Sequence, residues 1–243
     1  MTTDRWTQTV RQQLGFGRLL PLGGPGDGAW ITEAAAVSVL RRAADRMPGV
    51  RLGSLRLALV DPGDTSEPAV PPPPSALPPG PLRITAEFTA GPSEPLPATA
   101  SRLRAVLAGS ATDALGLAVT EVDLRVTELL EPEPAGDAAP PEQAGPDAAP
   151  PGEPQPSPGS DEARVAIAAL SVPGVTALRR TAHIEERRSD TALPRRHVRV
   201  EIEVGRAGRT LDLAGAVRAT VTEAFPDRPT TAVLVTAVAP GQG

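Results

Sequence analysis

The chain of 243 residues contains no cysteine, no lysine, no asparagine and no tyrosine. The lack of cysteine excludes disulfide bonds, thiol catalysis and thiolate metal sites. The lack of lysine excludes a phosphate-binding loop of the Gly-Lys-Ser or Gly-Lys-Thr type. Aromatic residues make up only 2% of the chain, so a hydrophobic core must be built from valine, leucine, isoleucine and alanine. Arginine in place of lysine, with abundant alanine, proline and glycine, is typical of a GC-rich, actinobacterial-type genome.

Long apolar runs and clustered positive charge are also missing. No run approaches the roughly 20 apolar residues that span a bilayer, and the first 15 residues lack the apolar region of a secretory signal. The net charge is −5, and residues 131–159 carry six acidic residues and no basic one. The remainder is close to neutral, which disfavours nucleic-acid binding. We therefore predict a cytoplasmic protein without a direct membrane span.

Proline is abundant, at 30 residues, and it is concentrated in two tracts. Residues 61–81 can form neither a helix nor a central strand, because proline lacks a backbone donor and fixes φ. We predict that they form a solvated insertion between two strands. Residues 131–159 contain almost no large apolar residue and cannot offset the chain entropy of folding, so we predict a disordered, extended linker.

The clearest structural pattern lies in residues 198–225. Apolar and charged residues alternate over 198–204, which is the period of a strand with one buried face. Apolar residues then recur every four positions over 213–225, as on one face of a helix. The Gly-x-x-Gly segment 205–208 lies between the two. We interpret it as a tight turn, because the comparable RNA-binding loop joins two helices rather than a strand and a helix.

A weaker copy of this strand and helix lies in the first half of the chain, so both halves have the order helix, Pro-Gly-Val, strand, loop, strand, turn, helix, strand. We predict an α+β fold of two tandem two-layer sandwich units, each approximately (β)αββαβ. The first unit covers residues 29–130 and contains the insertion 61–81, and the second covers 160–239. The disordered Pro-rich linker 131–159 joins them. An edge strand near residues 18–31 would complete the first unit.

The N-terminal segment, residues 1–28, contains a candidate amphipathic helix. Trp6, Val10 and Leu14 are spaced by four residues and form its apolar stripe. This helix could contact a membrane surface or a partner, or it could pack on its own domain. The stripe is narrow and few basic residues flank it, which disfavours a strong membrane anchor.

Several of these segments resemble the alkaline-shock-protein family of envelope stress response proteins. In the first half, Ile31-Thr32-Glu33-Ala34-Ala35 and Pro48-Gly49-Val50 resemble the opening of that family's domain. In the second half, Ser160-Asp161-Glu162, Pro173-Gly174-Val175, residues 198–205 and residues 231–238 resemble it more fully. The tandem arrangement and the two Pro-rich tracts depart from the family pattern. The resemblance implies a self-associating cytoplasmic scaffold that is held near the membrane by a separate anchor protein.

No residue pattern in the sequence indicates a catalytic or metal-binding site. His183 and His197 are the only histidines, and each falls opposite the apolar set of its strand, so we expect both to face solvent. They offer too few donors for a metal site, and no Gly-x-Ser-x-Gly motif is present. We therefore predict no enzymatic activity, no cofactor and no metal.

Three functional hypotheses remain open. The first is a non-enzymatic, envelope-stress-associated scaffold that forms a homo-oligomer or binds related alkaline-shock-type proteins or a membrane anchor. In this hypothesis Arg199, Glu201 and Glu203 lie on an exposed sheet face and make charged, register-fixing contacts. The second is nucleic-acid binding through the Arg-rich loop 179–196. The third is a small-molecule regulatory module in which the two units pair to form a ligand site.

Overall fold

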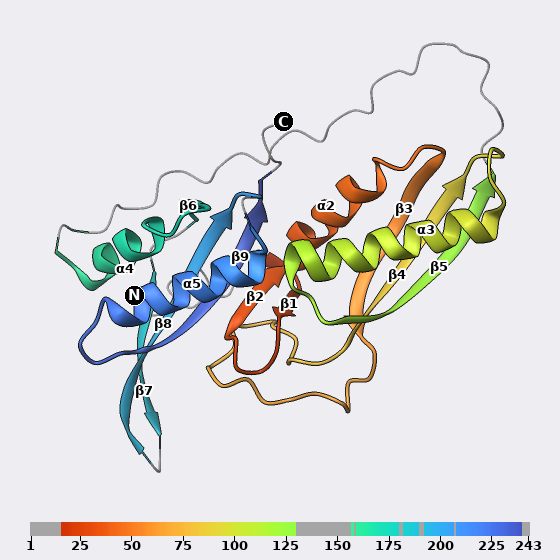
Figure 1. Cartoon of the computed structure of the whole chain (residues 1–243). Coiled ribbons are helices and arrows are strands. Elements are labelled where there is room, and N and C mark those ends of the chain that lie inside the picture. Colours follow the sequence, from red (N-terminus) through yellow and green to blue (C-terminus); the bar gives the residue numbers. More distant parts are fainter. Residues whose placement is uncertain are drawn as a thin grey trace, which may run out of the picture.

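The computed structural model describes residues 16–129, 159–179, 182–189, 192–206 and 208–239, together with Ser157. These residues form a mixed α+β fold with two β-sheets and helices packed against them, as the sequence predicts (Figure 1). Trp6, Val10 and Leu14 lie outside the described residues, as does the predicted linker 131–159 apart from Ser157 and Gly159. Among the helices that the structure describes, none has the length and apolar character needed to cross a membrane.

The smaller sheet belongs to the first half of the chain. Its strand order is β3-β4-β5, with β3 and β4 antiparallel and β4 and β5 parallel. The strands are β3 (Val50–Leu59), β4 (Leu82–Ala90) and β5 (Val119–Leu129), and the helices beside them are α2 (Glu33–Ala44), α3 (Leu96–Gly109) and the π-helix η2 (Ser110–Leu115). Helix α3 therefore continues into a π-helical turn, which Gly116 ends in a left-handed conformation with φ of 89°.

The larger sheet combines both ends of the described chain. Its order is β1-β2-β9-β8-β6, and β7 also pairs with β8. The strands are β1 (Leu19–Leu22), β2 (Ala29–Thr32), β6 (Val175–Leu178), β7 (His183–Ser189), β8 (Ala192–Val204) and β9 (Thr230–Val238), and the helices are α4 (Asp161–Leu170) and α5 (Thr210–Glu223). Strands β8 and β9 are parallel and are connected by α5.

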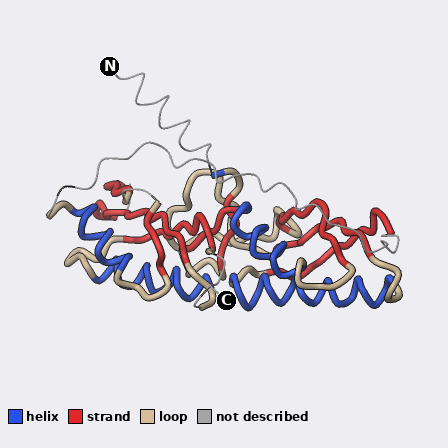
Figure 2. Tube along the Cα trace, turned by 90° about the horizontal axis from the view of Figure 1, so that it is seen from above, coloured by secondary structure: helices blue, strands red, loops and turns tan. Residues whose placement is uncertain are grey.

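The helices form one layer and the strands another, with α5 and α3 lying end to end (Figure 2). Helix α2 lies where the two sheets meet, because it packs against β9 of the larger sheet and against β3 of the smaller one. A single continuous hydrophobic core therefore includes residues from both sheets, among them Phe88 and Phe225.

Helices α2 and α4 each begin at a residue whose side chain caps the first turn. The Thr32 hydroxyl accepts a bond of 3.2 Å from the Ala35 N–H, and the Ser160 hydroxyl accepts one of 3.2 Å from the Ala163 N–H. Each hydroxyl satisfies a backbone donor that the helix itself leaves without a partner.

The first half has the predicted order helix, strand, strand, helix, strand, and the second half has the same order with β7 as one additional strand. Equivalent glycines make equivalent contacts in the two halves. In the two Pro-Gly-Val turns, Gly49 and Gly174 have φ of 72° and 100°, a region that favours glycine. The Gly49 carbonyl accepts a bond of 2.7 Å from the Gly91 N–H, and the Gly174 carbonyl accepts one of 2.8 Å from the Gly205 N–H. The Pro-Gly-Val turns therefore have the same structural role in both halves.

The edge strand expected for the first half lies in the other sheet, so that detail of the prediction is wrong. Strand β2 pairs in parallel with β9, with Trp30 opposite Leu234, and β1 pairs with β2. All four residues of each short strand are buried, as are Val233, Leu234 and Val235 on β9. Period and burial predict a strand, but they do not say which of two similar sheets it joins.

The Pro-rich insertion connects β3 and β4 and is largely exposed, as predicted, but part of it packs on the protein. Val70 is only 8% exposed, in a small apolar cluster that also contains Leu19, Trp30 and Leu234. Backbone bonds of 3.2 Å and 2.9 Å join Leu19 to Ser75 and Leu77. The loop lies on the opposite side of the strands from the helices (Figure 2). Prolines fix an extended backbone that can cover a sheet without forming a strand.

The Arg-rich loop expected over residues 179–196 forms a β-hairpin in part, made by β7 and the start of β8. Strands β7 and β8 pair antiparallel from His183 opposite Arg199 to Ser189 opposite Ala192. Strand β8 therefore begins well before the apolar alternation that predicts it.

Candidate functional site

The three charged residues predicted for an exposed contact surface lie on an interior strand. Strand β8 lies between β9 on one side and β6 and β7 on the other. Glu201 is 7% exposed, which contradicts the expected exposed face at this position. Its carboxylate lies 4.0 Å from Arg199 Nε, and Glu203 pairs with Arg179 at 3.4 Å.

The burial of Glu201 follows from its neighbours in the sheet. Glu201 is opposite Leu234 on β9, and opposed residues point to the same face. Leu234 belongs to the apolar cluster that the Pro-rich insertion covers. The sequence places the charges on the face opposite the helices, but it does not reveal that another segment covers much of that face.

In the Arg-rich segment 179–196, the Arg196 side chain contacts other parts of the protein. Arg196 forms ion pairs with Asp161 at 2.5 Å and with Asp227 at 3.5 Å, and its guanidinium lies 5.0 Å from the centre of the Phe225 ring. Because these contacts hold the guanidinium against the protein, they give no support to phosphate binding by Arg196.

The two histidines differ in environment. His197 is 6% exposed, contrary to the prediction, and its Nδ1 lies 3.0 Å from the Thr230 hydroxyl oxygen. His183 is exposed and pairs with Glu185 at 2.5 Å. In the described ranges, no group of three or more histidine or acidic side chains is arranged to hold a metal ion.

The sheets have several edge strands, and two of them are covered. On β3, the Leu57 N–H donates to the Glu33 carboxylate at 3.2 Å, and the Leu57 carbonyl accepts from Arg18 at 3.0 Å. Arg41 also donates to the carbonyls of Leu52 and Gly53. The outer edge of β1 bonds to the Pro-rich insertion. Side chains and a loop thus occupy backbone groups that could otherwise pair with another chain.

The edge of β5 is the long open edge of the smaller sheet. The strand has 11 residues and pairs with β4 on one side. Within the described residues, one side chain reaches its backbone, because Arg104 Nε donates to the Val122 carbonyl at 3.1 Å. Val126 and Leu129 are exposed by 37% and 63%, whereas most large apolar side chains that the structure describes are buried or half-buried.

The side chains of β5 separate into an apolar and a charged face. Val122 and Leu124 pack against the core. Asp123 and Arg125 point to the opposite face and are exposed by 63% and 80%. Asp123 lies 3.4 Å from Arg83 on β4, and Arg125 lies 3.9 Å from Glu87. On this open edge, a negative charge at Asp123 and a positive charge at Arg125 therefore lie on the two sides of Leu124.

Sequence reasoning predicted β5 as a strand but did not identify it as a candidate site. The alternation of Val122, Leu124 and Val126 with charged residues was a clear signal. Its edge position became visible only from the topology, because β2 pairs with β9 and leaves the corresponding side of β5 without a strand.

Comparison with protein-family models, with curated protein sequences and with solved structures finds no match to this chain. The resemblance to the alkaline-shock-protein family therefore rests on the quoted motifs alone.

Proposed function

We propose that the chain is a non-enzymatic interaction protein that associates with a second copy of itself through the β5 edge. The two β5 strands pair antiparallel about a twofold axis at Leu124 and join two sheets into one. The observation that carries this proposal is the self-complementary arrangement of charges around Leu124 on an open edge.

The register follows from simple geometry. Residues opposite each other in an antiparallel pair point to the same face, so a twofold axis must place one residue opposite its own copy. With Leu124 on the axis, Asp123 is opposite Arg125 of the second copy, and this pair occurs twice. An axis at Asp123 or Arg125 would instead place like charges opposite each other, which is unfavourable.

The apolar face supports the same register. Val122 is then opposite Val126 of the second copy, so the two strands would together cover Val126, which is partly exposed in the single chain. Apolar burial, backbone hydrogen bonds and two charged pairs then act together at one edge.

Related alkaline-shock-type proteins with a similar edge, or a membrane anchor protein, are further partners under this proposal. Such a partner would hold a cytoplasmic scaffold at the membrane periphery and connect it to envelope stress. The motif resemblance supports this extension, and the β5 edge offers a physical means of contact.

We expect Arg125→Glu and Asp123→Lys each to weaken self-association by about 30-fold. Each change places two like-charged pairs across the axis, at roughly 1 kcal/mol per pair. An equimolar mixture should recover near-wild-type affinity, because a mixed dimer again has opposite charges in both pairs. Sedimentation velocity and light scattering measure this directly.

Arg51→Glu makes the same change as Arg125→Glu on β3, whose exposed Arg51 lies outside the proposed interface. Its association should match that of the wild type. A wild-type chain that stays monomeric at high concentration would refute the proposal. It would also be refuted if the Arg125→Glu and Asp123→Lys variants each associated as the wild type does, or if their equimolar mixture associated no more tightly than either variant alone.

A further inference from the structure

A pocket of about 500 Å³ lies where the two halves of the chain meet. Val39 and Ala43 of α2 form one wall, and residues of η2 form another. Arg206 follows β8, and Thr210 is the first residue of α5. A volume of this size fits a small metabolite, and π-helical turns such as η2 are frequent at functional sites.

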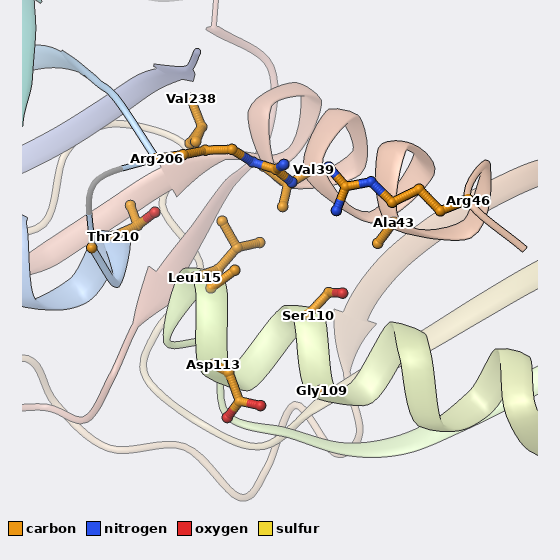
Figure 3. Close-up of a pocket in the computed structure, with 12 residues that line it drawn as sticks. Val39, Ala43, Arg46, Gly109, Ser110, Asp113, Leu115, Arg206, Thr210 and Val238 are labelled. Carbon is orange, nitrogen blue, oxygen red and sulfur yellow. The ribbon is translucent and has the colours of Figure 1, made fainter. Parts of the chain in front are cut away.

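Two arginines face each other across this pocket. Arg46 follows α2 and Arg206 precedes α5, and their guanidinium groups turn toward one another (Figure 3). No ion pair joins either of them to a carboxylate among the described residues. Two like charges held together at a pocket repel each other, and a bound anion would remove that repulsion.

A third arginine adds to the positive field. Arg42 donates to the Ser38 hydroxyl and the Val238 carbonyl, and its Nε is buried without a hydrogen-bond partner. Burial lowers the pKa of Arg42, and the charges of Arg206 and Arg46 lower it further.

Polar groups other than the arginines also line the pocket. The first N–H groups of α5, a helix of 14 residues whose start has no side-chain cap, begin at Thr210, and such groups favour anions. Ser110 contributes a hydroxyl. Asp113 lies on the side away from the two facing guanidinium groups (Figure 3), and its carboxylate can accept hydrogen bonds from a ligand hydroxyl.

We infer that this pocket binds a phosphate monoester that carries hydroxyl groups, such as a sugar phosphate. The phosphate lies between Arg46 and Arg206, because guanidinium groups bind phosphate through paired N–H donors. A hydroxyl of the ligand donates to Asp113. The site is independent of the β5 edge, so ligand binding and self-association are tested separately.

Titration calorimetry of the full chain with ribose 5-phosphate, inorganic phosphate and ribose at low salt tests the inference. We expect ribose 5-phosphate to bind more tightly than phosphate, and ribose not to bind. Arg46→Gln and Arg206→Gln should each raise the dissociation constant at least tenfold. Arg51→Gln, which removes an exposed arginine on β3, should leave it unchanged. Asp113→Asn should tighten phosphate binding and abolish the preference for ribose 5-phosphate.

Thermal unfolding without ligand gives a second readout. Arg206→Gln should melt at a higher temperature than the wild type, because it relieves the repulsion among the arginines. The inference is overturned if neither phosphate compound binds the wild type, or if the arginine variants bind as tightly as the wild type does. It is also overturned if ribose 5-phosphate binds no more tightly than inorganic phosphate. A lower melting temperature for ligand-free Arg206→Gln would also contradict it.

Discussion

Replacing Trp30 by alanine is expected to lower the free energy of unfolding by about 3–5 kcal/mol. The indole is 1% exposed and lies in the apolar cluster beneath the Pro-rich insertion, where its Nε1 donates to the Leu77 carbonyl at 3.3 Å. Removing it leaves a cavity between β2 and that insertion. Because β2 pairs with β9, amide hydrogen exchange should accelerate at Val233 and Val235, far away in sequence.

Trp30→Phe keeps an aromatic ring and loses the hydrogen bond, so it should cost only about 1–2 kcal/mol. Circular dichroism in urea measures both variants without relying on the substituted tryptophan. If Trp30→Ala left exchange in β9 unchanged, the pairing of the N-terminal strands with the C-terminal strand would be wrong.

Replacing Gly116 by alanine is expected to cost about 3 kcal/mol. Gly116 ends η2 with φ of 89°, where a side chain costs about 1–2 kcal/mol. An added Cβ would also overlap Leu211 Cβ on α5, so that the two halves of the chain would have to separate slightly. The denaturation midpoint in urea should fall, with little change in the dependence on urea concentration.

Gly215→Ala is the matched control within the same region. Gly215 lies inside α5, and an added Cβ would meet nothing within 4 Å. The same chemical change should therefore stabilise the protein by about 0.5–1 kcal/mol, since alanine restricts the unfolded chain. Equal effects of the two substitutions would contradict the close contact between η2 and α5.

The helices and most strands could be predicted because their signals are local. Thr32 and Ser160 mark helix starts, and alternation identifies β4, β5 and the second half of β8. The partner of β2 could not be predicted, because two sheets of similar pattern compete for one strand. The folded position of residues 61–81 was also hidden, since extended proline segments have no periodic signal.

The candidate sites could not be located from the sequence either, because both depend on how the strands and helices are arranged. The β5 charges were readable in the sequence, but not the fact that one edge of β5 is open. Arg46 and Arg206 are 160 positions apart in the numbering and meet only because α2 packs against both sheets. The burial of Glu201 and His197 could not be predicted either, because the strand pattern places polar side chains on the exposed face and another part of the protein covers them.

Distances between spin labels on two copies of the chain test the proposed association most directly. The absence of cysteine allows a single cysteine to carry the label at Thr120, Asp123, Arg125 or Glu128. Pairing about Leu124 predicts equal, short distances for Asp123 and Arg125. It predicts distances longer by roughly 20 Å for Thr120 and Glu128, because separation grows by about 7 Å for each residue from the axis. Distances that do not vary along β5, or that have their minimum away from Leu124, would contradict the account.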